Sequence, residues 1–137
     1  SLTVAKARAK AKRKKKRLRP IDRLRKICLA LPEAEERETW EIPTFRVCDK
    51  IYVMYVEDED DRPGIWCKAP PGSQTILVGA DPGRFFVPPY VGHRGWVGMH
   101  LDRRVDWREV AVLVERSYRL TAPKRIVKGM MEVAADD

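Results

Sequence analysis

The sequence has few of the residues that build disulfide frameworks, metal centres or membrane spans. Its three cysteines, Cys28, Cys48 and Cys67, are an odd number without C-x-x-C spacing, and its two histidines, His93 and His100, stand seven residues apart. Neither pattern is typical of a disulfide scaffold or a zinc site. No apolar run approaches 18 residues, and no apolar region of a signal peptide follows the basic N-terminus. We therefore expect a cytoplasmic protein that neither spans nor binds a membrane, with no metal and no other cofactor.

Acidic residues are absent from the first 19 positions, which instead hold ten basic residues. These are Lys6, Arg8, Lys10, Lys12, Arg13, Lys14, Lys15, Lys16, Arg17 and Arg19. The other 18 of the 28 Lys and Arg residues face all 20 Asp and Glu residues, so positions 20–137 have a net charge of −2. Any binding of a polyanion that is argued from net charge therefore belongs to the tail.

A chain of 137 residues can bury one ordinary core. We predict a basic tail over residues 1–19, disordered or helical, followed by one α+β domain over residues 20–137. The tail cannot bury an apolar face, but its Ala, Lys and Arg residues favour a helix once a polyanion neutralises their charge.

Hydrophobic spacing predicts the elements of the domain. We expect an amphipathic helix from Pro20 to near Pro32, and strands over residues 38–42, 44–48, 50–57 and 65–69, with the acidic run 57–61 at a hairpin tip. A short helix over 73–78, an ordered loop over 85–95 and a strand over 96–101 follow. Asp106 then caps a long helix that Pro123 limits, and a terminal helix covers 124–133.

Six short motifs stand out along the chain: ICLALPE at 27–33, FFVPPYVG at 85–92, GWVG at 95–98, VDW at 105–107, SYRL at 117–120 and APKR at 122–125. Together they resemble the MmcQ/YjbR family of bacterial proteins. The resemblance covers roughly residues 23–126. It implies a CyaY-like fold, with a curved antiparallel sheet and helices packed on one face, and the DNA-binding label that the family carries by analogy of fold. The long basic tail is an addition to the family pattern.

Two segments are candidates for binding nucleic acid, with DNA favoured over RNA. The ten basic tail residues can neutralise phosphates and release counterions, which does not require a specific base sequence. The loop 84–96 adds the cations Arg84 and Arg94, and the planar side chains of Phe86, Tyr90, His93 and Trp96 are candidates for stacking on bases or lining a pocket.

The same loop supports an alternative function. It can line the pocket of a small-ligand or protein-binding module in which the tail is incidental, or it can simply cover the core with Phe85 and Trp96 buried. The acidic run 57–61 is expected to be a solvated turn and not a metal site. The three cysteines are expected to be buried and inert, and no catalytic residue is assigned, so the protein is expected not to be an enzyme.

Overall fold

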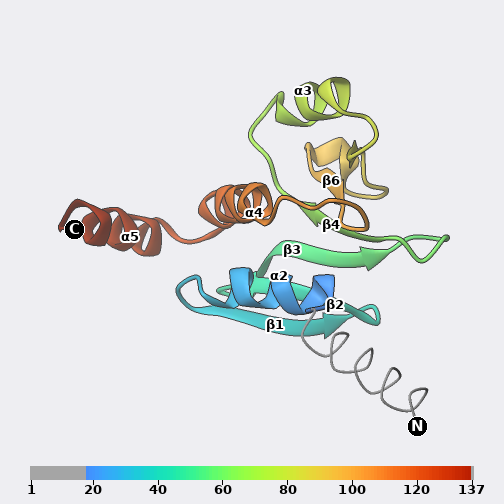
Figure 1. Ribbon diagram of the computed structural model, residues 1–137. Helices are drawn as coiled ribbons and strands as arrows, with labels where there is room; N and C mark the ends of the chain where they lie inside the picture. Colours follow the sequence, from blue (N-terminus) through green and yellow to red (C-terminus); the bar gives the residue numbers. More distant parts are fainter. Residues whose placement is uncertain (1–17, 137) are drawn as a thin grey trace, which may run out of the picture.

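The computed structural model describes residues 18–136 and has an α+β architecture (Figure 1). Its elements in chain order are α2 (Pro20–Leu29), β1 (Ala34–Thr39), β2 (Ile42–Val47), β3 (Lys50–Glu57), β4 (Pro63–Cys67), α3 (Ser73–Ala80), β5 (Phe85–Phe86), the 3-10 helix η1 (Gly92–Arg94), β6 (Val97–His100), α4 (Trp107–Thr121) and α5 (Lys124–Asp136). The strands form one antiparallel sheet in the order β1-β2-β3-β4-β6-β5. This confirms the predicted fold class.

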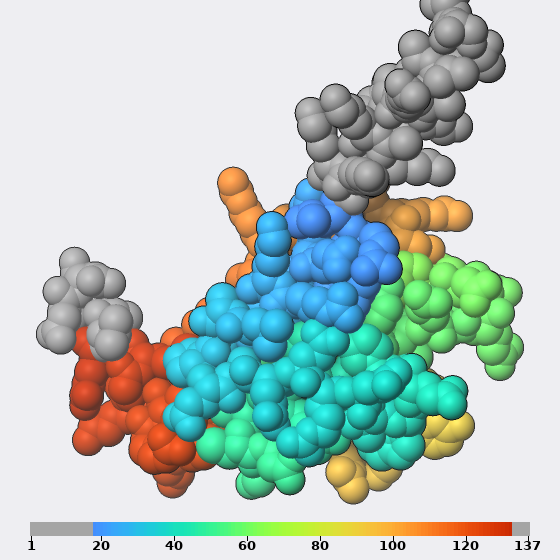
Figure 2. Space-filling model, turned by 90° about the horizontal axis from the view of Figure 1, so that it is seen from below, coloured from blue at the N-terminus to red at the C-terminus, as the bar shows by residue number. Residues whose placement is uncertain are grey.

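Helices α2 and α4 cover one face of the sheet and enclose the core with it. Leu24 of α2 and Val114 of α4 are fully buried against strand residues such as Phe45 and Ile65. Within residues 18–136 no helix covers the centre of the opposite face, and Figure 2 shows α2 (blue) and the segment around residue 90 (gold) on opposite sides of the β1–β2 hairpin (cyan). One face of the sheet therefore builds the core, and the other is available for a different role.

Two tight turns set the register of the first three strands. Trp40 and Glu41 have φ of 53° and 63°, and Cys48 and Asp49 have φ of 47° and 66°. Each pair links strands whose flanking residues are paired, Thr39 with Ile42 and Val47 with Lys50. Two-residue loops with positive φ at both positions are type I′ turns, whose twist matches that of a hairpin.

The prediction of a strand over 38–42 was wrong, because the chain reverses at Trp40. β1 instead begins at Ala34, with the charged sequence AEERET at the edge of the sheet. Charged side chains are typical of edge strands, but they interrupt the alternation of apolar residues by which strands are predicted from sequence. Pro43 lies inside β2 and does not end a strand. The expectation that Cys48 is buried was also wrong, since its place in the second turn leaves it exposed.

A bulge in β3 decides which of its side chains reach each face. Phe45 pairs with Val53 and Arg46 with Ile51, so Tyr52 is left without a partner in β2. An extra residue of this kind shifts the alternation of side chains. Tyr52 and Val53 both join the core, whereas Ile51 and Met54 line a groove on the open face.

The remaining elements agree with the predicted ones within a few residues. Asp106 caps α4 by accepting a hydrogen bond from the Arg108 backbone N–H at 3.0 Å. The acidic run forms the β3–β4 tip, where Asp58 Oδ1 accepts from the backbone N–H groups of Asp60 and Arg62, both at 2.9 Å. The segment predicted as a loop over 85–95 contains β5 and η1. No helix in the described part of the chain is long and apolar enough to cross a membrane.

Candidate binding groove on the open face of the sheet

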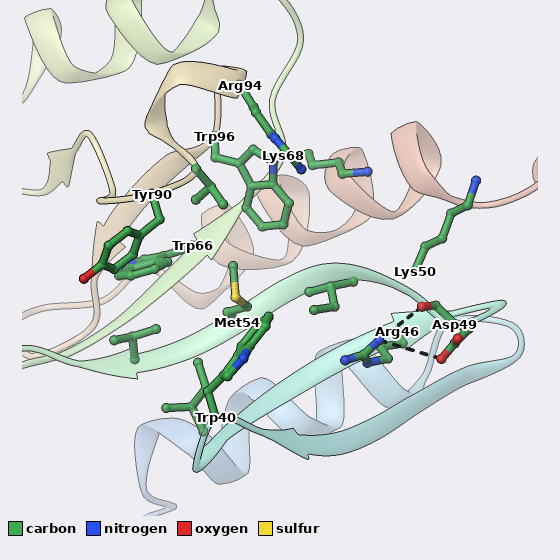
Figure 3. Close-up of a pocket in the computed structure, with 14 residues that line it drawn as sticks. Trp40, Arg46, Asp49, Lys50, Met54, Trp66, Lys68, Tyr90, Arg94 and Trp96 are labelled. Atoms are coloured by element: carbon green, nitrogen blue, oxygen red, sulfur yellow. Dashed lines mark hydrogen bonds and ion pairs between the residues drawn. The ribbon is translucent and has the colours of Figure 1, made fainter.

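The open face carries a groove of about 740 Å³ between the β1–β2 turn and the loop before β6 (Figure 3). Its lining combines tryptophan, tyrosine and aliphatic side chains with four cations. The lining residues are Trp40, Ile42, Arg46, Asp49, Lys50, Ile51, Met54, Val56, Trp66, Lys68, Tyr90, Val91, Arg94 and Trp96. We call this surface the open-face groove.

Two exposed aromatic residues border the open-face groove. Trp40 is 74% exposed and Tyr90 is 87% exposed. Both have a left-handed backbone, with φ of 53° and 68°, which is unfavourable for bulky side chains. Neither residue gains much from burial, so packing against the described residues does not account for a large ring at either position. Residues held in strained conformations cluster at functional sites, and these two are placed to contact a ligand.

Two more tryptophans form the floor and wall. Trp66 on β4 is partly buried and presents a ring to the groove, as Figure 3 shows. Trp96 is only 6% exposed, and the Lys68 ammonium lies 6.0 Å from the centre of its ring. Trp96 therefore supports the wall and positions Lys68 by a cation–π contact, and it offers little free ring face for stacking.

Three cations meet at one end of the groove. Lys50 begins β3, Lys68 directly follows β4 and Arg94 ends η1. None of them forms an ion pair with a carboxylate of residues 18–132. Partial burial lowers the pKa of the Lys68 ammonium, and the positive charges of Lys50 and Arg94 lower it further. Cations that repel one another in this way are suited to an anionic ligand.

The fourth cation is held in place by its neighbours. The Arg46 guanidinium donates to Thr39 Oγ1 at 3.0 Å and to the Asp49 carbonyl oxygen at 3.2 Å. Asp49 is the one acidic residue among the described residues that line the groove, and its carboxylate lies 2.6 Å from Arg37 and 3.7 Å from Arg46. The lining therefore keeps a positive balance.

The loop that carries Tyr90 and Arg94 is fixed to α3. Gln74 donates from its side-chain amide to the carbonyl oxygens of Gly92 at 2.8 Å and Trp96 at 2.6 Å. These two bonds hold both ends of the segment that contains η1, so the groove wall is preorganised.

A second hollow of about 510 Å³ adjoins the open-face groove. Val56 and Trp66 line both hollows. The second one is bordered by the β3–β4 tip, whose side chains Glu57, Asp58, Glu59 and Asp60 face it, together with Phe86 and His100. Trp66 thus stands between a cationic and an acidic surface.

The structure brings together three of the residues that the sequence singled out in the loop 84–96. Tyr90, Arg94 and Trp96 line the open-face groove. Phe86 does not, because its ring covers Gly98 and lies 4.6 Å from the His100 ring. His93 is exposed on η1 and lies outside the lining of the groove.

Arg84 is committed to partners within the chain. Its guanidinium lies 2.6 Å from Asp81 and 2.8 Å from Glu109, and these hydrogen-bonded carboxylates, Glu109 first, raise its pKa. Arg19 similarly pairs with Asp22 at 2.9 Å. The other nine basic residues of the tail lie outside the described residues, so the predicted phosphate contacts of the tail stay a prediction.

Sequence reasoning missed Trp40, Trp66, Lys50 and Lys68. The spacing of Trp66 and Lys68, two apart in the strand predicted over 65–69, was the available signal, because such spacing places both side chains on the same face. The bulge at Tyr52 concealed the corresponding pattern in β3. No group of three potential metal ligands occurs among the residues that the structure describes.

Comparisons with known proteins give a family and a similar solved structure. A family model described as YjbR matches residues 29–120, which is more than half of the chain. The crystal structure of Deinococcus radiodurans protein DR2400, described as a DUF419 domain, is similar with a TM-score of 0.64 and 25% identity, covering 73% of this chain and 76% of that chain. No curated protein matches.

Proposed function

The chain belongs to the YjbR family, and we propose that it binds nucleic acid without catalysis, taking unpaired bases into the open-face groove while the basic tail contacts phosphates. The observation that carries this proposal is the pair of exposed aromatic residues, Trp40 and Tyr90, held in left-handed conformations beside cations. Single-strand binding surfaces combine stacking aromatics with a positively charged groove.

The groove favours single strands over duplexes. Aromatic rings can stack only on bases that are not already stacked on both sides, and the apolar floor formed by Ile51 and Met54 suits a base better than a phosphate. Lys50, Lys68 and Arg94 then supply contacts to the backbone of the strand. The tail adds affinity that does not depend on sequence or strandedness.

The proposal is tested by fluorescence anisotropy with labelled single-stranded and duplex DNA, and the corresponding RNA, at several salt concentrations. The chain is compared with a full-length variant in which the nine basic residues from Lys6 to Arg17 are replaced by Gln, called here the Gln-tail chain. We expect the Gln-tail chain to lose duplex binding and to keep a weaker, single-strand-specific binding. Loss of all binding in this variant would restrict the activity to the tail.

Variants of the groove separate stacking from charge. Tyr90→Ala in the Gln-tail chain removes a ring, and we expect single-strand affinity to fall about 5- to 100-fold, as for one lost base stack. Tyr90→Phe keeps the ring and is expected to bind normally. Ile76→Ala is a matched control, because Ile76 is 70% exposed on α3 outside the groove.

A small planar anion is the second candidate ligand. The volume of the groove lies within the range of small-molecule sites, and four of its lining residues come from the loop 84–96. Competition by a mononucleotide distinguishes the two cases. If a mononucleotide displaces a single strand at a comparable concentration, the groove is a small-ligand site; if only oligonucleotides compete, the nucleic-acid function stands.

A further inference from the structure

We propose that the open-face groove receives the end of a single strand and not an internal stretch. This inference rests on the proposed function and adds which part of the nucleic acid is recognised. Its basis is the change of charge along β3, from the cations around Lys50 to the acidic tip that begins at Glu57.

The length of β3 sets the scale of this charge gradient. Lys50 and Glu57 are the ends of the strand and lie roughly 23 Å apart at about 3.3 Å per residue. Between them, Ile51, Met54 and Val56 form an apolar track along the groove. Figure 3 shows Trp40, Trp66 and Tyr90 toward one side of this track and Lys50 and Lys68 toward the other.

The cationic end can hold the phosphates of a strand that leaves the groove. Lys68 follows β4 on the side where Lys50 begins β3, since Cys67 pairs with Val53. Arg94 faces the same end, and its charge is felt at Lys68. A backbone running over these three side chains meets positive charge, and the one carboxylate among the described residues that line the groove, that of Asp49, is paired with Arg37 at 2.6 Å.

The acidic end opposes the passage of a phosphate backbone. Beyond Trp66 the second hollow presents Glu57, Asp58, Glu59 and Asp60. Arg62 does not balance them, because its guanidinium lies 2.7 Å from Asp102 and is paired with it. A phosphate brought to within about 4 Å of one of these carboxylates is repelled by it even in water.

An internal stretch needs phosphates on both sides of each base, whereas a terminal nucleoside needs them on one side only. Stacking the last base at Trp66 and Tyr90 satisfies this condition, because the chain then leaves over the cations alone. The groove thus selects strand ends by attraction at one end and repulsion at the other.

The test compares a linear oligonucleotide with its circular form, of the same sequence and about 20 nucleotides, for binding to the Gln-tail chain. We expect the linear form to bind at least about tenfold more tightly, a difference of about 1.4 kcal/mol. Equal affinities would overturn the end preference and leave single-strand binding intact. Absence of binding to both forms would instead overturn the proposed binding of bases in the groove and restrict the activity to the tail.

A variant of the acidic tip tests whether its repulsion of phosphates causes the preference for strand ends. Glu59→Gln with Asp60→Asn in the Gln-tail chain weakens the repulsion, and neither side chain makes a hydrogen bond to the described residues. We expect the circular form to bind at least about threefold more tightly to this variant, with the linear form little changed. Glu38→Gln with Glu132→Gln makes the same change of charge elsewhere and is expected to have no such effect. An equal gain in both variants would show that net charge, not the acidic tip, sets the preference.

Discussion

Ser117 on α4 donates a hydrogen bond of 2.6 Å to the carbonyl oxygen of Tyr52, the residue that the bulge leaves without a partner in β2. The same hydroxyl accepts a hydrogen bond of 2.9 Å from the backbone N–H of Lys68. One fully buried side chain therefore satisfies two backbone groups and fixes the point from which Lys68 enters the open-face groove.

Replacing this hydroxyl is expected to destabilise the fold. Ser117→Ala leaves two backbone groups without their partner, and we expect the free energy of unfolding to fall by about 1–3 kcal/mol, measured by chemical denaturation. Ser73→Ala, at the start of α3, is the control and is expected to change it by less than about 0.5 kcal/mol. A near-neutral Ser117→Ala would mean that water replaces the hydroxyl.

Trp40 is expected to raise the affinity for a single strand and to lower the stability of the fold. Trp40→Asn places a residue that tolerates positive φ in the type I′ turn, so we expect unfolding free energy to rise by about 0.5–1 kcal/mol. Single-strand affinity should fall because a ring is lost at the rim of the groove. Trp40→Phe keeps a ring and is expected to retain most binding. Loss of stability in Trp40→Asn would indicate that the indole is held by packing.

Substitutions of Arg94 and Arg84 are expected to differ in their effects on the salt dependence of binding and on stability, although both residues lie in the loop 84–96. Arg94→Gln in the Gln-tail chain should lower the slope of log affinity against log salt by about 0.7, the value for one phosphate contact on a single strand. Arg84→Gln should leave the slope unchanged and reduce stability, because Arg84 is paired with Asp81 and Glu109. The reverse result would assign the phosphate contact to Arg84.

His100 is expected to make stability depend on pH. Burial, followed by the positive charge of Arg62, lowers the pKa of His100 below its ordinary value of 6.5. The unfolded chain therefore binds more protons than the folded chain as the pH falls through this range, and acid favours unfolding. We expect stability to fall between pH 7.5 and 5 more steeply in the natural chain than in His100→Gln, as measured by urea denaturation. Parallel curves would contradict this role.

Three features could be predicted because each depends on contacts within a few residues. They are the amphipathic helix after Pro20, the cap at Asp106 and the hairpin tip at the acidic run. β1 could not, since its charged residues make an edge strand whose identity depends on pairing with β2. Of the site, the loop residues Tyr90, Arg94 and Trp96 were found by composition. Lys50, Lys68, Trp40 and Trp66 were not, because they join the site only when strands distant in sequence pair.

The sequence by itself determined the fold class, the family and the separation of charge between the tail and the rest of the chain, since these follow from composition, spacing and short motifs. Only the tertiary structure decided which face each strand residue occupies, because the bulge at Tyr52 shifts the alternation within β3. It also decided that Arg84 is paired whereas Arg94 lines the groove, since Glu109 on α4 binds Arg84 and strands distant in sequence build the groove beside Arg94. A binding surface on a sheet depends on strand register, and register is fixed by the packing of the whole domain.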